Sequence, residues 1–128
     1  MAKNILLVED DAAIIDVYQI AFGGAGFKVE TLSDGQSVMD KVKDIESGKA
    51  KAPDLILLDI VLPDINGMDL LKEIKNNKKT KNIKLIVLSN NTDSELKKMG
   101  YELGNQKCLT KSQYTPTQLV EIIKKELK

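Results

Sequence analysis

The chain has 128 residues, of which 42% are hydrophobic, and its 19 acidic residues balance 19 basic residues that are all lysine. This length suits one domain whose core can cover a sheet on both faces, so we expect a single domain over residues 1–128 and no output domain. The longest apolar run is far below the roughly 20 residues of a membrane span, and the start lacks the pattern of an export signal. We therefore expect a cytoplasmic protein.

Missing residue types exclude several kinds of site. The chain has no histidine, and its one cysteine, Cys108, has no partner for an internal disulfide. Catalytic triads that use histidine and zinc sites that combine cysteine with histidine are therefore excluded. Any chemistry must come from carboxylates, hydroxyls and lysines.

Charge is divided unevenly along the chain. Residues 1–66 hold twelve acidic residues and six lysines, whereas residues 67–128 hold seven acidic residues and thirteen lysines, which gives net charges of −6 and +6. Without arginine there is no bidentate fork for bases or phosphates, and the aromatic residues show no stacking pattern. We expect no direct nucleic-acid binding and no membrane contact, and we interpret the lysines between residues 72 and 84 as a solvated helix end and loop.

Apolar segments of strand length alternate with amphipathic segments of helix length. We expect strands near residues 4–8, 28–32, 54–59, 83–88 and 107–110. The third and fourth are continuously apolar, as expected of central parallel strands that are covered on both faces. The pattern predicts an α/β fold with a flavodoxin-like, doubly wound, five-stranded parallel sheet in a three-layer α/β/α sandwich.

Several segments between the strands carry signals for the start of a helix. The capping-box pattern occurs at Ser33-x-x-Gln36, Thr92-x-x-Glu95 and Thr115-x-x-Gln118, the last with Pro116 at the first helical position. Asn66 followed by Asp69 predicts one further helix start. Residues 46–53 have loop composition and are interpreted as a surface insertion.

Four apolar runs end on residues that can handle a phosphoryl group. ILLV precedes Glu9 and Asp10, LILL precedes Asp59, LIVL precedes Ser89, and CLT precedes Lys111. The carboxyl ends of parallel strands open onto one crevice, so these side chains should be neighbours. Three clustered anions favour a divalent cation such as Mg²⁺, and one carboxylate remains as a nucleophile. The sequence therefore predicts Mg²⁺-assisted phosphoryl transfer to an aspartate.

These residues, together with a D-x-x-x-P-x-x-x-G motif formed by Asp59, Pro63 and Gly67, resemble the receiver domain of two-component response regulators, of the single-domain chemotaxis-regulator type. The resemblance covers essentially the whole chain. It implies a monomeric phosphoacceptor signalling domain, rather than an enzyme, that takes a phosphoryl group from a histidine kinase or a histidine phosphotransfer protein. It also implies binding to a downstream protein target, not identified by the sequence, through the fourth helix, fifth strand and fifth helix.

The resemblance implies a role for each site residue. Asp59 matches the phosphoacceptor and is also a Mg²⁺ ligand. Asp10 matches a direct Mg²⁺ ligand, Glu9 a ligand through water, and the backbone carbonyl of Val61 a further ligand. Ser89 matches the hydroxyl that hydrogen-bonds the phosphoryl group, and Lys111 matches the lysine that pairs with the phosphoryl group and Asp59.

Three positions depart from the family pattern. Ser112 follows Lys111 where the family has a proline after a cis peptide bond, which implies either a strained bond or a rearranged loop. Asn90 replaces a small residue and narrows access to Asp59. Cys108 stands where an aromatic side chain usually acts as the switch, so we expect altered signal output, with Tyr101 as the alternative adaptable group.

Two other functions are compatible with the same fold. One is a pseudo-receiver, a docking module that is not phosphorylated. The other is a flavodoxin-like nucleotide or flavin binder, which the lack of a phosphate-cradling glycine loop after the first strand disfavours.

Overall fold

A five-stranded parallel sheet forms the centre of the computed structural model, which describes residues 2–128. The strand order is β2-β1-β3-β4-β5, as in a doubly wound fold. The strands are β1 (Asn4–Val8), β2 (Lys28–Leu32), β3 (Leu55–Leu58), β4 (Lys84–Ser89) and β5 (Cys108–Thr110). Each lies within one residue of its predicted bounds, and the predicted flavodoxin-like α/β/α fold is confirmed.

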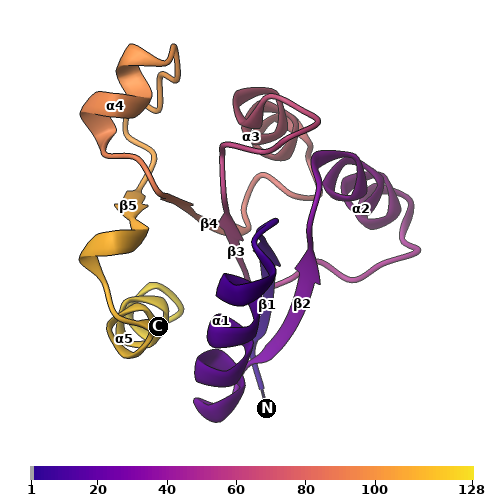
Figure 1. Cartoon of the computed structure of the whole chain (residues 1–128). Coiled ribbons are helices and arrows are strands. Elements are labelled where there is room, and N and C mark those ends of the chain that lie inside the picture. The colour runs from indigo at the N-terminus through magenta and orange to yellow at the C-terminus, as the bar shows by residue number, and fades with distance from the viewer. Residues whose placement is uncertain (1) are drawn as a thin grey trace.

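Helices cover both faces of the sheet (Figure 1). One face carries α1 (Ala12–Gly24) and α5 (Pro116–Glu126), and the other carries α2 (Gly35–Ser47) and α3 (Gly67–Asn76). The short α4 (Asp93–Lys98) lies near β5, and its Leu96 joins the core on the side of α2 and α3. A single 3₁₀ turn, η1 (Lys111–Gln113), follows β5. Among residues 2–128, none of the helices combines the length and apolar character needed to cross a bilayer.

The core consists of two apolar clusters, one on each face of the sheet. Along β1, Ile5 and Leu7 pack with Phe22 of α1, whereas Leu6 and Val8 pack on the side of α2 and α3. All four residues of β3 are buried. This explains why the central strands are continuously apolar rather than alternating.

The helix starts agree with the sequence in three places and differ in one. Thr92 and Thr115 form capping boxes, and the Asn66 side chain accepts a hydrogen bond from the Met68 N–H at the start of α3. The capping box predicted at Ser33 is wrong, because Asp34 is the N-cap of α2 and accepts from the Ser37 N–H at 2.7 Å.

The physical reason is a shift of the helix start by one residue. The Gln36 side chain donates to Asp40 Oδ1 at 3.0 Å, one turn along α2, instead of reaching back to the cap.

Gly67 allows close packing directly after the Asp59 loop. A Cβ atom at Gly67 would lie 1.9 Å from the carbonyl oxygen of Ile60, which is itself fully buried. Only a residue without a side chain lets α3 begin against this backbone. The glycine that ends the D-x-x-x-P-x-x-x-G motif thus fixes where α3 meets the end of β3.

We expect Gly67→Ala to lower the free energy of unfolding by about 1–3 kcal/mol, because the clash is with backbone that must shift as a unit. Urea denaturation measures this effect. Gly23→Ala in α1 is the matched control, since its added methyl group meets no atom within 4 Å, and it should be neutral or slightly stabilising. Equal stability of Gly67→Ala and the unchanged protein would contradict this packing.

Candidate functional site

The predicted site residues gather at the carboxyl edge of the sheet. Glu9 and Asp10 follow β1, Asp59 follows β3, Ser89 ends β4, and Lys111 follows β5. In the paired strands Val8 lies opposite Leu58, and Ser89 lies opposite Thr110. The parallel register therefore brings the residues after these strands to one edge, as the sequence predicts.

Lys111 is held between two buried carboxylates. Its Nζ donates to Glu9 Oε1 at 2.7 Å, to Glu9 Oε2 at 2.6 Å and to Asp59 Oδ2 at 3.0 Å. Glu9 is 1% exposed, Asp59 5% and Lys111 8%. The contact with Asp59 agrees with the sequence analysis, but the shorter, two-oxygen contact with Glu9 was not anticipated.

Both carboxylate oxygens of Asp59 are engaged. Oδ2 accepts from Lys111, and Oδ1 accepts from the Val61 N–H at 3.0 Å. The Asp59 backbone N–H donates to the Val8 carbonyl oxygen at 3.0 Å, which extends the contact between β1 and β3. The orientation of this carboxylate is therefore fixed on both sides before any ligand binds.

Glu9, Asp10 and Asp59 form an acidic cluster suited to a cation. Each offers a carboxylate oxygen, and these oxygens lie within 4.8 Å of one another. Asp10 is exposed whereas the other two are buried, so the cluster reaches the surface at Asp10. A set of hard oxygen donors fits Mg²⁺ or a similar divalent ion, and the residues present are therefore able to hold one.

Burial shapes the protonation of this cluster. It raises the pKa of Glu9 to about 7; hydrogen bonding to Lys111 opposes the rise and the neighbouring Asp59 adds to it. Burial lowers the pKa of Lys111, but the hydrogen bonds and charges of Glu9 and Asp59 outweigh it, so the pKa is raised overall. Lys111 therefore stays charged at neutral pH.

Ser89 and Val61 lie at the same edge but in different settings. The fully buried Ser89 accepts a hydrogen bond through Oγ from the Asn91 N–H at 3.1 Å. Val61 is exposed and forms an isolated antiparallel bridge with Asn66. For residues 2–128, the hydrogen bonds of Ser89 include none to Asp59, so this structure brings the hydroxyl to the edge without joining it to the carboxylate.

The loop after Lys111 begins with a short turn. Lys111 to Gln113 form the 3₁₀ turn η1, and residues 2–128 contain no cis peptide bond. Ser112 is accommodated in this turn. Asn90, which directly follows Ser89, is exposed, and its effect on access to Asp59 stays a prediction.

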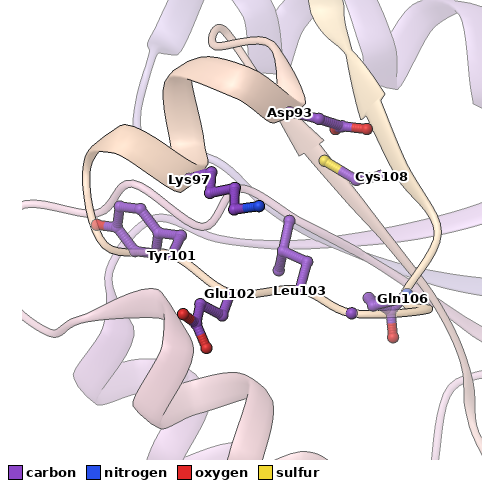
Figure 2. A pocket seen from close by; sticks show the side chains of 8 residues that line it. Asp93, Lys97, Tyr101, Glu102, Leu103, Gln106 and Cys108 are labelled. Carbon is purple, nitrogen blue, oxygen red and sulfur yellow. The ribbon is translucent and has the colours of Figure 1, made fainter.

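A cavity of about 420 Å³ lies between α4 and the segment that leads into β5 (Figure 2). Cys108 and Tyr101 both line it, with Lys97 and Leu103 between them in the view of Figure 2. Cys108 also lines a second cavity of about 370 Å³ on the side of Tyr114. The small side chain at the position of the expected switch is thus flanked by open space on two sides.

The Cys108 thiol is poorly suited to reactivity. Burial raises its pKa to about 12, and the nearby Asp93 carboxylate adds to the rise. Because the thiolate is the reactive form, Cys108 contributes to the shape of the cavities rather than to nucleophilic chemistry.

The raised pKa of Glu9 predicts that the metal-free protein loses stability as pH rises from about 5 to about 7. The folded state holds the Glu9 proton up to a pKa of about 7, whereas the unfolded chain releases it near 4.5, so the folded state binds more protons in this window. No histidine titrates there. Urea denaturation in EDTA at stepped pH measures this, and Glu9→Gln should flatten the profile. An unchanged slope in that variant would contradict the assignment.

Residues 5–124 match the response regulator receiver domain family. The DNA-binding response regulator MtrA of Mycolicibacterium paratuberculosis is 28% identical over 128 residues, which is 100% of this chain and 52% of that protein. The alkaline phosphatase synthesis transcriptional regulatory protein PhoP of Bacillus subtilis is 31% identical over 111 residues, which is 87% of this chain and 43% of that protein. The chain spans about half the length of the curated relatives it matches.

Solved structures show the same fold over almost the whole chain. The chemotaxis response regulator CheY4 of Vibrio cholerae aligns with a TM-score of 0.79 at 25% identity and covers 99% of this chain and 100% of its own. The phosphorylated cyanobacterial phytochrome response regulator RcpA aligns with a TM-score of 0.76 at 34% identity and covers 98% and 91%. The family match, the fold and the expected resemblance agree, and the chain belongs to the response regulator receiver domain family.

Proposed function

We propose that this receiver domain accepts a phosphoryl group on Asp59 from a phosphohistidine of a histidine kinase or histidine phosphotransfer protein. The observation that carries the proposal is the buried Lys111, which contacts both Asp59 and Glu9 where Glu9, Asp10 and Asp59 could hold a metal. A module that only docks has no evident use for three buried ionisable groups at this edge, since burying each of them costs free energy.

The proposed transfer is a displacement at phosphorus. A carboxylate oxygen of Asp59 forms a bond to phosphorus as the bond from phosphorus to the histidine nitrogen breaks, and the electron pair leaves with the imidazole, which takes up a proton. Lys111 supplies a positive charge beside the phosphoryl oxygens, and the Ser89 hydroxyl supplies a hydrogen bond once it reaches them. The product is an acyl phosphate on Asp59.

The residues that would hold Mg²⁺ are Glu9, Asp10 and Asp59, with the carbonyl of Val61 as a backbone ligand. When bound, the ion offsets negative charge on the acidic cluster and the phosphoryl oxygens. Lys111 occupies both Glu9 oxygens in this structure, which favours contact between Glu9 and the ion through water. Asp10 is the exposed member of the same cluster, so we expect its carboxylate to bind the ion directly.

The proposed output is a change in the binding of a downstream protein at the face formed by α4, β5 and α5. Lys111 connects this face to the site, because it directly follows β5 and starts η1. Tyr101 and Cys108 line one cavity beside α4, so Tyr101 has open space in which to change position when a movement of Ser89 and Asn90 displaces α4. Since Cys108 is small, we expect a modest change in target affinity on phosphorylation.

We expect a small-molecule phosphodonor with Mg²⁺ to add one phosphoryl group, stable in acid and labile to hydroxylamine, that Asp59→Asn abolishes. Intact mass spectrometry measures the extent of modification. Asp69→Asn, an exposed acid on α3, is the control and should be modified like the unchanged protein. Full modification of Asp59→Asn would overturn the assignment of the acceptor, and no modification of the unchanged protein would favour a pseudo-receiver.

We expect Asp10→Ala to remove the rise in melting temperature that Mg²⁺ produces, because binding to the folded state is the source of that rise. In EDTA the same variant should be as stable as the unchanged protein or more stable, since one of three crowded anions is gone. Thermal melts with and without Mg²⁺ measure both effects. A metal-induced rise of the original size in Asp10→Ala would show that the ion binds elsewhere.

A further inference from the structure

The loop between β3 and α3 is tied to the start of α2 by one carboxylate. Asp64 Oδ1 accepts from the Gly35 N–H at 2.8 Å, and Oδ2 accepts from the Gln36 N–H at 3.0 Å. These two backbone hydrogen bonds lower the pKa of Asp64, so the side chain is ionised at neutral pH. A two-oxygen contact of this kind fixes both the position and the rotation of the carboxylate.

Gly35 allows the loop to come this close. A Cβ atom at Gly35 would lie 2.7 Å from Ile65 Cβ and 3.2 Å from Asp64 Oδ1. The contact with Ile65 involves an atom next to the backbone, so it cannot be relieved by turning a flexible end. Gly35 and Asp64 therefore act together as one junction between the loop and α2.

The same loop includes the backbone next to Asp59, the proposed phosphoacceptor. The Val61 N–H donates to Asp59 Oδ1, and Val61 forms a β-bridge with Asn66 across the loop. Asp64 lies in the turn that this bridge closes. Holding Asp64 thus restrains the turn that orients Val61.

The junction also reaches the other side of the acidic cluster. The Glu9 N–H donates to the Leu32 carbonyl oxygen at 3.0 Å, and Leu32 ends β2 only three residues before Gly35. The short segment 32–36 is therefore bonded both to the backbone of Glu9 and, through Asp64, to the loop that follows Asp59. This segment therefore links the backbone at Glu9 to the loop that follows Asp59, although it contributes no residue to the acidic cluster.

We propose that Asp64 is a positioning residue for the cation and phosphoryl site, because it joins the loop after Asp59 to the start of α2 and so holds the Val61 backbone in place. This inference rests on the proposed function, in which the Val61 carbonyl is a ligand. Helix α2 keeps its own N-cap, Asp34, which accepts from the Ser37 N–H. Loss of Asp64 should therefore affect the loop more than the helix.

The test measures Mg²⁺ affinity by isothermal titration calorimetry in the full chain. Asp64→Ala should weaken Mg²⁺ binding about tenfold, as loss of a group that orients metal ligands typically does. Asp64→Asn, which keeps one acceptor oxygen, should have an intermediate effect. Melting temperatures in EDTA should change little in either variant.

Two further variants separate the effect of loop position on Mg²⁺ affinity from the effect of net charge. Gly35→Ala keeps the charge of Asp64 but displaces the loop, so it should weaken Mg²⁺ binding in the same direction as Asp64→Ala. Asp69→Ala removes an exposed acid from the first turn of α3 without touching the junction, so it should leave Mg²⁺ affinity nearly unchanged. Equal losses in Asp69→Ala and Asp64→Ala would mean that net charge, not position, sets the affinity, and would overturn the proposal.

Hydrogen exchange in EDTA gives a readout that needs no metal. Amides of residues 61–66 should exchange faster in Asp64→Ala than in the unchanged protein. Unchanged exchange together with unchanged Mg²⁺ affinity would overturn the positioning role while leaving the proposed function intact. If the unchanged protein bound no Mg²⁺, the proposed function would fail and the positioning role with it, whereas faster exchange would still identify the junction as a structural contact.

Discussion

The burial of the Lys111 ammonium group is the constraint on which the carboxyl edge of the sheet depends. A charge taken out of water costs several kcal/mol unless it is well paired, and removing one partner of a buried pair typically costs about 3–5 kcal/mol. Lys111 meets this requirement through Glu9 and Asp59, which come from β1 and β3. Two buried carboxyl groups around one ammonium group give an excess of acidic groups, which together with Asp10 accounts for a site suited to a divalent ion.

The backbone around the site is fixed by contacts that carry no chemistry of their own. Gly67 lets α3 start against the Ile60 carbonyl, Asn66 caps that helix, and Val61 bridges to Asn66. These contacts hold the loop after Asp59 at its two ends, and Asp64 holds its turn. The geometry offered to a ligand is thus set by a short, closely packed loop rather than by the acidic residues alone.

The strands, and the meeting of the candidate site residues at one edge, could be predicted from the sequence because each of these residues directly follows an apolar run and parallel strands end together. The closer contact of Lys111 with Glu9 than with Asp59 could not be predicted, since the sequence does not show how far side chains from two strands reach. Nor could the contact between Asp64 and α2, which joins positions 28 and 29 residues apart with no periodic signal. The start of α2 was misplaced by one residue because Ser33 and Asp34 are both good caps, and only the packed loop decides between them.

Beryllofluoride, which forms a tetrahedral adduct with a carboxylate and imitates a phosphoryl group, tests most directly whether this edge is a phosphoryl site. Fluorine nuclear magnetic resonance of the unchanged protein should show bound fluoride resonances when beryllofluoride and Mg²⁺ are both present, and none when Mg²⁺ is removed. In a parallel series of proton–nitrogen spectra, the resonance of the Lys111 ammonium group should shift, because this group gains fluoride as a partner. The absence of any bound fluoride signal at saturating Mg²⁺ would contradict the account.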